Sequence, residues 1–171
     1  MVAGSPMKTV AIRVAREADI PAIVGFWNPV IRETTVTFAS EEKSEAGLRA
    51  MFDARRAAGR EVFVADLGGL AVGIASYDQF RGGDGYRHAM EHTVILAREV
   101  RGGGIGRRLM HALEDHARQA GGHVMVGGIS GENAAGIAFH AALGYVETGR
   151  MPQVGRKFGR WLDLVLMQKL L

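Results

Sequence analysis

Apolar and polar residues change their period several times along the chain, and each change predicts a new element. Residues 10–14 alternate with the two-residue period of a strand. The sequence Asp19-Ile20-Pro21 then opens a helix, because an acidic residue and a proline both suit a first helical turn. We expect Asn28 and Pro29 to break or kink this helix and to leave a polar, threonine-rich loop after it.

A second helix is predicted to start after Ser40 and to end at Gly59, because apolar residues recur there at helical spacing. Two alternating segments, 61–66 and 71–77, flank the pair Gly68-Gly69 and predict a β-hairpin. A polar, glycine-rich segment over residues 79–87 separates this hairpin from the rest of the chain.

Strands and helices alternate in the second half of the chain. Residues 88–96 predict a strand with Glu91, Thr93 and Ile95 on one face and Met90, His92, Val94 and Leu96 on the other. An amphipathic helix begins at Ile105, with Ile105, Leu109, Ala112, Leu113, His116 and Ala117 on one face. Residues 124–129 predict a strand, 133–143 a helix and 161–167 the closing strand. This order is typical of a mixed α/β domain.

One continuous domain accounts for residues 8–171, because no repeat, linker or low-complexity stretch divides them. Residues 1–7 have neither a basic start nor an apolar core, so we expect a disordered or cloning-derived leader outside the fold. The apolar runs are far shorter than the ~20 residues that a membrane span needs. We therefore expect a cytoplasmic protein that does not bind membranes.

Composition narrows the possible chemistry. The chain has no cysteine, which excludes disulfides, a thiol nucleophile and cysteine zinc sites. His88 and His92 share a predicted strand face, but no third ligand follows at a recognisable spacing, so no metal site is expected. The net charge of +3 is small, and residues 155–161 form a single basic and aromatic segment. We therefore expect no nucleic-acid partner.

Three consecutive glycines, Gly102 to Gly104, lie between the strand at 88–96 and the helix at 105. Glycine is costly at a helix start, but bare N–H groups at a helix N-terminus can surround a phosphate. Two nucleotide-binding patterns fail here. A phosphate loop of the NTPase kind needs a lysine after the glycines, and a dinucleotide fingerprint needs a third glycine at fixed spacing and an acidic residue ~20 positions later. A flexible turn without a ligand is the alternative.

Residues Arg101 to Gly106 fit the pattern [QR]-x-x-G-x-[GA], on which the chain resembles the GNAT superfamily of acyl-CoA-dependent N-acyltransferases. Residues 133–140 with Leu143-Gly144-Tyr145 match a second motif of that superfamily, N-x-x-A-x-x-F-[YH] followed by LG[FY]. The resemblance implies a central, mostly antiparallel sheet with flanking helices, in which splayed strands hold acyl-CoA. It also implies acetyl-CoA as co-substrate and a homodimer.

More narrowly, residues 86–94, 123–126 and 152–163 resemble the phosphinothricin and methionine sulfoximine acetyltransferase branch. The likeness runs from about Ile12 to the end of the chain. Members of that branch acetylate the α-amino group of small amino-acid analogues with a polar side-chain group. We therefore expect a small amino-acid-like substrate. Another small amine, a protein N-terminus, or a non-catalytic sensor that only binds acyl-CoA are the alternatives.

The resemblance assigns the pantetheine arm to the strand at 88–96 and the CoA pyrophosphate to the glycine loop. Asn133 is expected to hydrogen-bond the pantetheine arm or to cap its own helix, and the two roles are compatible. The complete predicted cofactor site is Val94, Ile95, Leu96, Arg101, Gly102, Gly103, Gly104, Ile105, Gly106, Arg107 and Asn133.

An amino acid presents a carboxylate, which attracts arginine and hydroxyl donors. Arg81 and Arg87 bracket a glycine-rich loop before the central strand, so we predict that they bind substrate, although most arginines are solvated. Thr35 lies in the loop after the first helix, where turn chemistry explains it equally well. The complete predicted substrate site is Thr35, Phe80, Arg81, Gly82, Arg87, Glu91, His92 and Thr93.

Glu91 and His140 are the predicted catalytic residues. Acetyl transfer to an amine requires a base for the ammonium and a donor for the oxyanion, and it can use an acid for the thiolate. Glu91 lies on the strand beside the expected thioester and is the predicted base, directly or through water; a structural ion pair is the alternative. A backbone N–H near Val94 is the predicted oxyanion donor. His140 replaces the tyrosine common in the superfamily and is expected to protonate or hydrogen-bond the sulfur.

Overall fold

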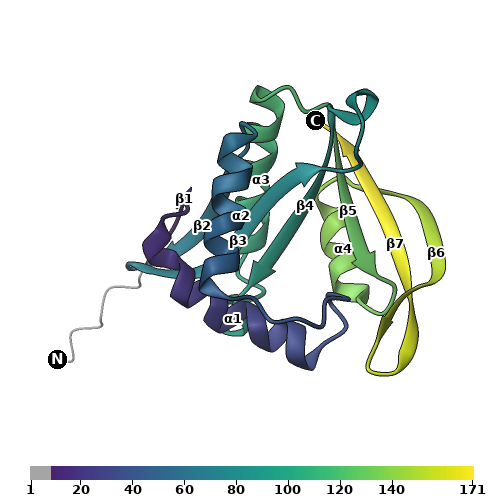
Figure 1. The fold of residues 1–171 in the computed structure, drawn as a ribbon, viewed down its shortest axis with the longest axis horizontal. Helices are drawn as coiled ribbons and strands as arrows, with labels where there is room; N and C mark the ends of the chain where they lie inside the picture. The colour runs from purple at the N-terminus through teal and green to yellow at the C-terminus, as the bar shows by residue number, and fades with distance from the viewer. Residues whose placement is uncertain (1–8) are drawn as a thin grey trace.

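The computed structural model describes residues 9–171, so the predicted leader at 1–7 and residue 8 lie outside the described residues. Within them, the structure has seven strands and four α-helices (Figure 1). They follow the predicted order, and the strand at 146–157, before the closing strand, is the one for which no bounds were predicted. Their bounds are β1 (Val10–Val14), α1 (Ile20–Glu33), α2 (Glu45–Ala57), β2 (Val62–Leu67), β3 (Leu70–Gln79), β4 (Ala89–Leu96), α3 (Ile105–Gln119), β5 (Val124–Ser130), α4 (Ala134–Ala142), β6 (Val146–Lys157) and β7 (Arg160–Leu170).

All seven strands belong to one sheet with the order β1-β2-β3-β4-β5-β7-β6. Each neighbouring pair is antiparallel except β4 and β5, which are parallel. The predicted hairpin is β2–β3, with Gly68 and Gly69 at its turn. The prediction of a mixed α/β fold with a mostly antiparallel sheet is confirmed.

Helix α1 runs through Asn28 and Pro29 and ends at Glu33, so the predicted break at this pair is wrong. Proline removes one backbone hydrogen bond from a helix, a cost that tertiary packing can offset. Here the residues on both sides of the proline are buried: Trp27 is 7% exposed and Ile31 is 1% exposed. Their burial against the sheet holds the helix together across Pro29.

Helix α2 begins four residues later than Ser40 suggested, after the N-cap Ser44, whose hydroxyl accepts from the Gly47 N–H. Two hydrogen bonds explain the delay. The Asn28 carboxamide donates to the carbonyl of Lys43 (2.9 Å) and accepts from its N–H (2.7 Å). Because both backbone groups of Lys43 are engaged by α1, this residue cannot join the helix.

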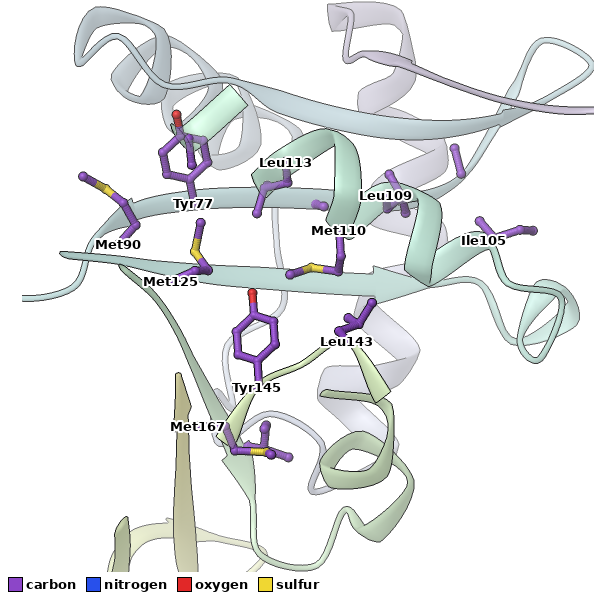
Figure 2. Close-up of a cluster of buried hydrophobic side chains, with 14 of the residues drawn as sticks. Tyr77, Met90, Ile105, Leu109, Met110, Leu113, Met125, Leu143, Tyr145 and Met167 are labelled. Carbon is purple, nitrogen blue, oxygen red and sulfur yellow. The ribbon is translucent and has the colours of Figure 1, made fainter. Parts of the chain in front are cut away.

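Two hydrophobic clusters cover opposite faces of the sheet. One joins the sheet to α1 and α2 and includes Ile23 and Phe52. The other lies under α3, where Leu109 and Leu113 belong to one cluster with Met125 and Tyr145 (Figure 2). Strand β4 contributes Met90 to the second cluster and Ile95 to the first, which confirms the predicted division of its faces.

Strands β4 and β5 separate soon after they begin. Their pairing covers only Ala89–Glu91 against residues 124–126, whereas β4 pairs with β3 and β5 with β7 along their whole lengths. Figure 1 shows the two strands meeting near the C-terminus of the chain and diverging toward the other end, with α4 beside the opening. The predicted splay is therefore present, and it positions the candidate site.

Candidate active site

The splay leaves backbone groups of β4 without a strand partner. The N–H of Ala97 donates to the Val72 carbonyl at one end of the β3–β4 ladder, and the N–H of Phe80 donates to the Ala89 carbonyl at the other. Because backbone groups alternate in direction along a strand, the odd-numbered residues of β4 face β3. Val94 and Leu96 therefore direct their N–H and C=O groups toward β5, whose pairing with β4 has already ended at Glu91.

The glycine loop forms the start of α3. Gly102 and Gly104 have φ angles of +83° and +75°, which favour glycine, and no side chain caps the helix. The first helical bond is Arg108 N–H to the Gly104 carbonyl, so the N–H groups of residues 105–107 have no intrahelical acceptor. Three free N–H groups at the positive end of a helix dipole suit an anion.

The fourth glycine of the motif has a packing role. A Cβ at Gly106 would lie 3.1 Å from two ring carbons of Phe139, so the absent side chain lets α3 approach α4. The arginines of the motif are exposed. The Arg101 guanidinium donates to the Leu96 carbonyl (3.2 Å), and that of Arg107 to the Ala142 carbonyl (3.4 Å). Arg101 also lines a second cavity of about 650 Å³ between α1 and the β4–α3 connection.

A cavity of about 300 Å³ opens where β4 and β5 diverge. Residues of β4 and β5 form its floor, and α4 and the α1–α2 loop form its walls. Of the predicted site residues it holds His92, Thr93, Val94, Ile95, Asn133 and His140. The rest of its lining is Trp27, Val36, Thr37, Phe38, Ala39, Lys43, Gly128, Ile129, Ser130 and Leu164.

Glu91 lies beside this cavity on the face that carries α1 and α2. A Cβ at Gly128, which lines the cavity, would be 3.2 Å from the Glu91 Oε1. The carboxyl group is half-buried, and burial raises its pKa above the ordinary value. A carboxylate with a raised pKa is a stronger base than one in water.

His92 and His140 meet on the opposite face. A Cβ at Gly127, the residue before Gly128, would lie 3.0 Å from the His92 Nε2 and 3.3 Å from the His140 ring. Glu91 and His92 are neighbours on β4, so their side chains point to opposite faces of the sheet. His140 contacts His92 and therefore lies on the face opposite to Glu91, and the gap between the splayed strands is the opening that joins the two faces. Burial lowers the pKa of both imidazoles, that of His92 to about 3, so both are neutral.

Asn133 is the N-cap of α4, and its Oδ1 accepts from the Gly136 N–H (2.9 Å). The Gly136 carbonyl in turn accepts from the His140 Nδ1 (2.7 Å). One turn of helix thus orients both residues. The capping half of the Asn133 prediction is confirmed, and Asn133 also lines the cavity.

Several predicted substrate residues do not line the cavity. Arg81 and Gly82 are exposed, and the Arg81 guanidinium lies 5.5 Å from the ring centre of Tyr86. Arg87 donates to the His88 Nε2 at 2.9 Å and is also exposed. Phe80 is half-buried next to them at the end of β3. Thr35 donates to Glu132 (2.8 Å), which also binds Arg160.

The α1–α2 loop forms one wall of the cavity, and contacts with β6 hold it there. Phe38 packs against Gly155 so closely that a Cβ there would lie 2.3 Å from the ring. The buried Lys157 ammonium donates to the Thr37 carbonyl (2.7 Å). The β6–β7 hairpin therefore supports the loop, which brings Phe38 and Lys43 to the cavity beside Trp27 of α1. Sequence patterns placed neither Trp27 nor Lys43 in the site, and the Asn28 hydrogen bonds that position Lys43 are tertiary contacts.

A cofactor cleft between splayed parallel strands, a glycine-rich helix start for an anion and a half-buried carboxylate define an acyl-CoA-dependent N-acyltransferase. The family model described as "Acetyltransferase (GNAT) family" matches residues 27–145. The chain belongs to the GNAT family of acetyltransferases.

Several N-acyltransferases are similar to this chain in amino-acid sequence. L-amino acid N-acyltransferase MnaT of Escherichia coli is 43% identical over 158 residues, which cover 92% of each chain. The L-methionine sulfoximine/L-methionine sulfone acetyltransferase of Pseudomonas aeruginosa is 43% identical over 159 residues, again 92% of each. Phosphinothricin N-acetyltransferase of Alcaligenes faecalis is 32% identical and more distant, with 92% of this chain and 81% of the relative covered.

Solved structures share the fold. Salmonella typhimurium yncA, solved with its cofactor acetyl-CoA, superposes with a TM-score of 0.90 at 40% identity, covering 94% of this chain and 93% of the other. The structure titled ribosomal-protein-alanine N-acetyltransferase from Brucella melitensis has a TM-score of 0.91 at 42% identity, covering 94% and 99%. The predicted family and its phosphinothricin and methionine sulfoximine branch are confirmed.

None of the helices within residues 9–171 is long and apolar enough to cross a membrane. The same residues contain no group of three or more His, Asp or Glu side chains arranged to hold a metal ion.

Proposed function

We propose that this enzyme transfers the acetyl group of acetyl-CoA to the α-amino group of a small amino acid of the methionine sulfone, methionine sulfoximine or phosphinothricin type. One observation carries the proposal: the unpaired N–H of Val94 and the half-buried carboxyl group of Glu91 flank a single small cavity. A volume of about 300 Å³ suits a small molecule. The names of the relatives at about 43% identity point to the same substrate class.

Acetyl-CoA is proposed to bind along the splay. Its peptide-like pantetheine arm would pair with the free backbone groups of Val94 and Leu96, as a strand does. Arg101 would have to release the Leu96 carbonyl as the arm binds. The pyrophosphate would accept from the N–H groups of residues 105–107, with Arg101 and Arg107 supplying positive charge. Asn133 would donate its Nδ2 to the arm while its Oδ1 keeps the cap.

The proposed reaction is a direct transfer. Glu91 takes a proton from the substrate ammonium, and the amine attacks the thioester carbonyl carbon. The oxyanion that forms accepts from the Val94 N–H. The tetrahedral intermediate then collapses, the C–S bond breaks, and the second proton of the attacking nitrogen passes to the departing sulfur. His140 would relay that proton only after its Nε2 gives up the hydrogen bond from His92 (3.1 Å), since its Nδ1 donates to the Gly136 carbonyl. Thr93, on the same face as Glu91, would contact the substrate.

The test is the release of free thiol from acetyl-CoA in the presence of candidate acceptors. The panel contains L-amino acids, methionine sulfone, methionine sulfoximine, phosphinothricin and a short peptide that begins with alanine. We expect turnover on the amino-acid analogues. Turnover on the peptide alone would keep the family and overturn the substrate. Failure on every acceptor, in protein that acetyl-CoA still protects against thermal unfolding, would contradict the catalytic proposal.

A homodimer and a cytoplasmic location are further parts of the proposal. Strand β6 is an edge strand, and apolar side chains stand exposed on it, on the turn to β7 and at the start of β7: Met151 (44%), Val154 (49%), Phe158 (57%) and Trp161 (58%). Apolar surface of this kind suits a subunit contact. A monomeric mass by light scattering would contradict the dimer. The cytoplasm is proposed because a cell makes its acetyl-CoA there.

A further inference from the structure

Lys43 is a charged side chain on the wall of an otherwise uncharged cavity. Among the described residues that line the 300 Å³ cavity, Lys43 alone has a formal charge at neutral pH. His92 and His140 are the other titratable lining residues, and burial holds both neutral by lowering their pKa. The charges nearest to the cavity are therefore this ammonium group on its wall and the Glu91 carboxylate beside it.

Two contacts hold Lys43 in place. Its backbone is clamped by the Asn28 carboxamide, with distances of 2.7 and 2.9 Å. Its ammonium lies 5.2 Å from the ring centre of Trp27, which also lines the cavity. Trp27 is 7% exposed and cannot turn away. Held from both ends, the side chain loses little conformational entropy when it binds a ligand.

The ammonium also has no protein counterion within the described part of the chain. None of the carboxylates of residues 9–171 lies within 4.0 Å of the Lys43 Nζ, the limit for an ion pair. The neighbouring Glu42 is engaged instead by Arg32 at 2.6 Å. An aromatic face compensates an ammonium only in part. A fixed, unpaired cation in a concave site attracts an anion from solution.

We propose that Lys43 binds an oxyanion of the amino-acid substrate and so selects acceptors that carry one. This inference rests on the proposed function. Arg81 and Arg87, the sequence-based candidates for this role, are exposed and do not line the cavity. The ligand chemistry is that of a carboxylate or a phosphinate. Two groups can supply it: the α-carboxylate present in every amino acid, and a second oxyanion on the side chain.

Steady-state kinetics of Lys43→Met against the wild type test the inference. Methionine has a similar length and keeps an apolar contact with Trp27, so the fold should persist, which a thermal melt checks. The acceptors are methionine sulfone, its α-carboxamide, and phosphinothricin, which has a second oxyanion. We expect KM to rise about 10- to 100-fold for an acceptor whose oxyanion Lys43 binds, the range for a charge-assisted hydrogen bond. Lys43→Arg should restore most of the affinity.

The three acceptors distinguish whether Lys43 binds the α-carboxylate or the side-chain oxyanion of the substrate. A rise for methionine sulfone and phosphinothricin but not for the carboxamide assigns Lys43 to the α-carboxylate. A rise for phosphinothricin alone assigns it to the side-chain oxyanion. Unchanged KM values for all three acceptors, or a rise in the KM of acetyl-CoA instead, would overturn the inference while wild-type turnover still upheld the proposed function. Wild-type inactivity on every amino acid would instead reject the proposed function itself.

A control separates a specific contact from general electrostatics. Arg32 is exposed, lies at the end of α1 and lines neither cavity. Arg32→Met removes the same unit charge close to the loop. It should leave the KM of each acceptor within about twofold, because solvent screens an exposed charge. An equal effect of both substitutions would also overturn the proposed contact.

Discussion

The Nε2 atoms of His92 and His140 lie 3.1 Å apart, in rings whose planes differ by 17°. Both imidazoles are neutral, so only one of the two nitrogens carries the hydrogen between them. The His140 Nδ1 contacts the Gly136 carbonyl, which only accepts, so His140 carries its hydrogen on Nδ1. His92 Nε2 is therefore the donor and His140 Nε2 the acceptor. The buried Nδ1 of His92 is left without a partner among the described residues.

This arrangement predicts that the protein loses stability in mild acid. Burial lowers the pKa of His92 to about 3 from 6.5, and it lowers that of His140 as well. Below pH 6.5 the unfolded chain therefore binds protons that the folded chain does not. The free energy of unfolding should fall as the pH drops from about 6.5 toward 3, by about 2 kcal/mol at pH 5 from His92 alone. Chemical denaturation at pH 7 and pH 5 measures it.

Two variants test whether His92 causes this pH dependence of the free energy of unfolding. Tyr145 packs edge-on against both rings, and its hydroxyl donates to Glu114, which also binds Lys169, so these groups are kept intact. His92→Phe should lower stability at pH 7 by about 1–3 kcal/mol, because it leaves the His140 acceptor unpaired, and should flatten the slope. His111→Asn, at an exposed position of α3, should keep the wild-type slope. An unchanged slope in His92→Phe would refute the assignment.

Glu91 predicts the acid limb of the pH–rate profile. The deprotonated carboxylate is the active form, and burial raises its pKa, so kcat/KM should fall as the pH decreases through a value above that of an ordinary glutamate. Glu91→Gln should lower kcat by about 10²- to 10⁴-fold and remove this limb. The exposed Glu41→Gln is the control. A limb that persists in Glu91→Gln would belong to another group.

We expect substitution of Gly104 to weaken acetyl-CoA binding by more than its effect on protein stability explains. Its φ of +75° makes Gly104→Ala strained, at a cost of about 1 kcal/mol, and the distortion falls on the proposed pyrophosphate site. Gly59, which follows α2, has a φ of +72° and lines neither cavity. Gly59→Ala should cost similar stability but leave the Kd of acetyl-CoA unchanged in calorimetry, whereas Gly104→Ala should raise it several-fold. Equal Kd values would contradict the site.

We expect Gly155 of the β6–β7 hairpin to set the position of the α1–α2 loop, which forms a wall of the cavity. A methyl group there would meet the Phe38 ring at 2.3 Å, so Gly155→Ala must displace the α1–α2 loop. We expect a higher KM for the amino acid with little change in acetyl-CoA binding, since the cofactor site lies on other elements. Gly149→Ala on the same strand has nothing within 4 Å and is the matched control. A loss of acetyl-CoA affinity in Gly155→Ala would contradict this division.

Local patterns in the sequence were enough to predict most of the elements, their order, the family, and the residues of the splay and the glycine loop. These properties are encoded locally. The two-residue period of β4 separates Met90 from Glu91, and the glycines before Ile105 allow the positive φ angles that the helix start needs. Features of this kind depend on the local backbone and not on contacts with the rest of the chain.

Which side chains share the cavity depends on contacts between distant parts of the chain. Pro29 stays helical because distant residues bury Trp27 and Ile31, a gain that no local propensity records. Lys157 reaches the Thr37 carbonyl from 120 residues away. The placement of Lys43 in the cavity, and of Arg81 outside it, depends on such contacts between segments remote in sequence. Periodicity reports how each element buries its own face, whereas a pocket is defined by how several elements meet.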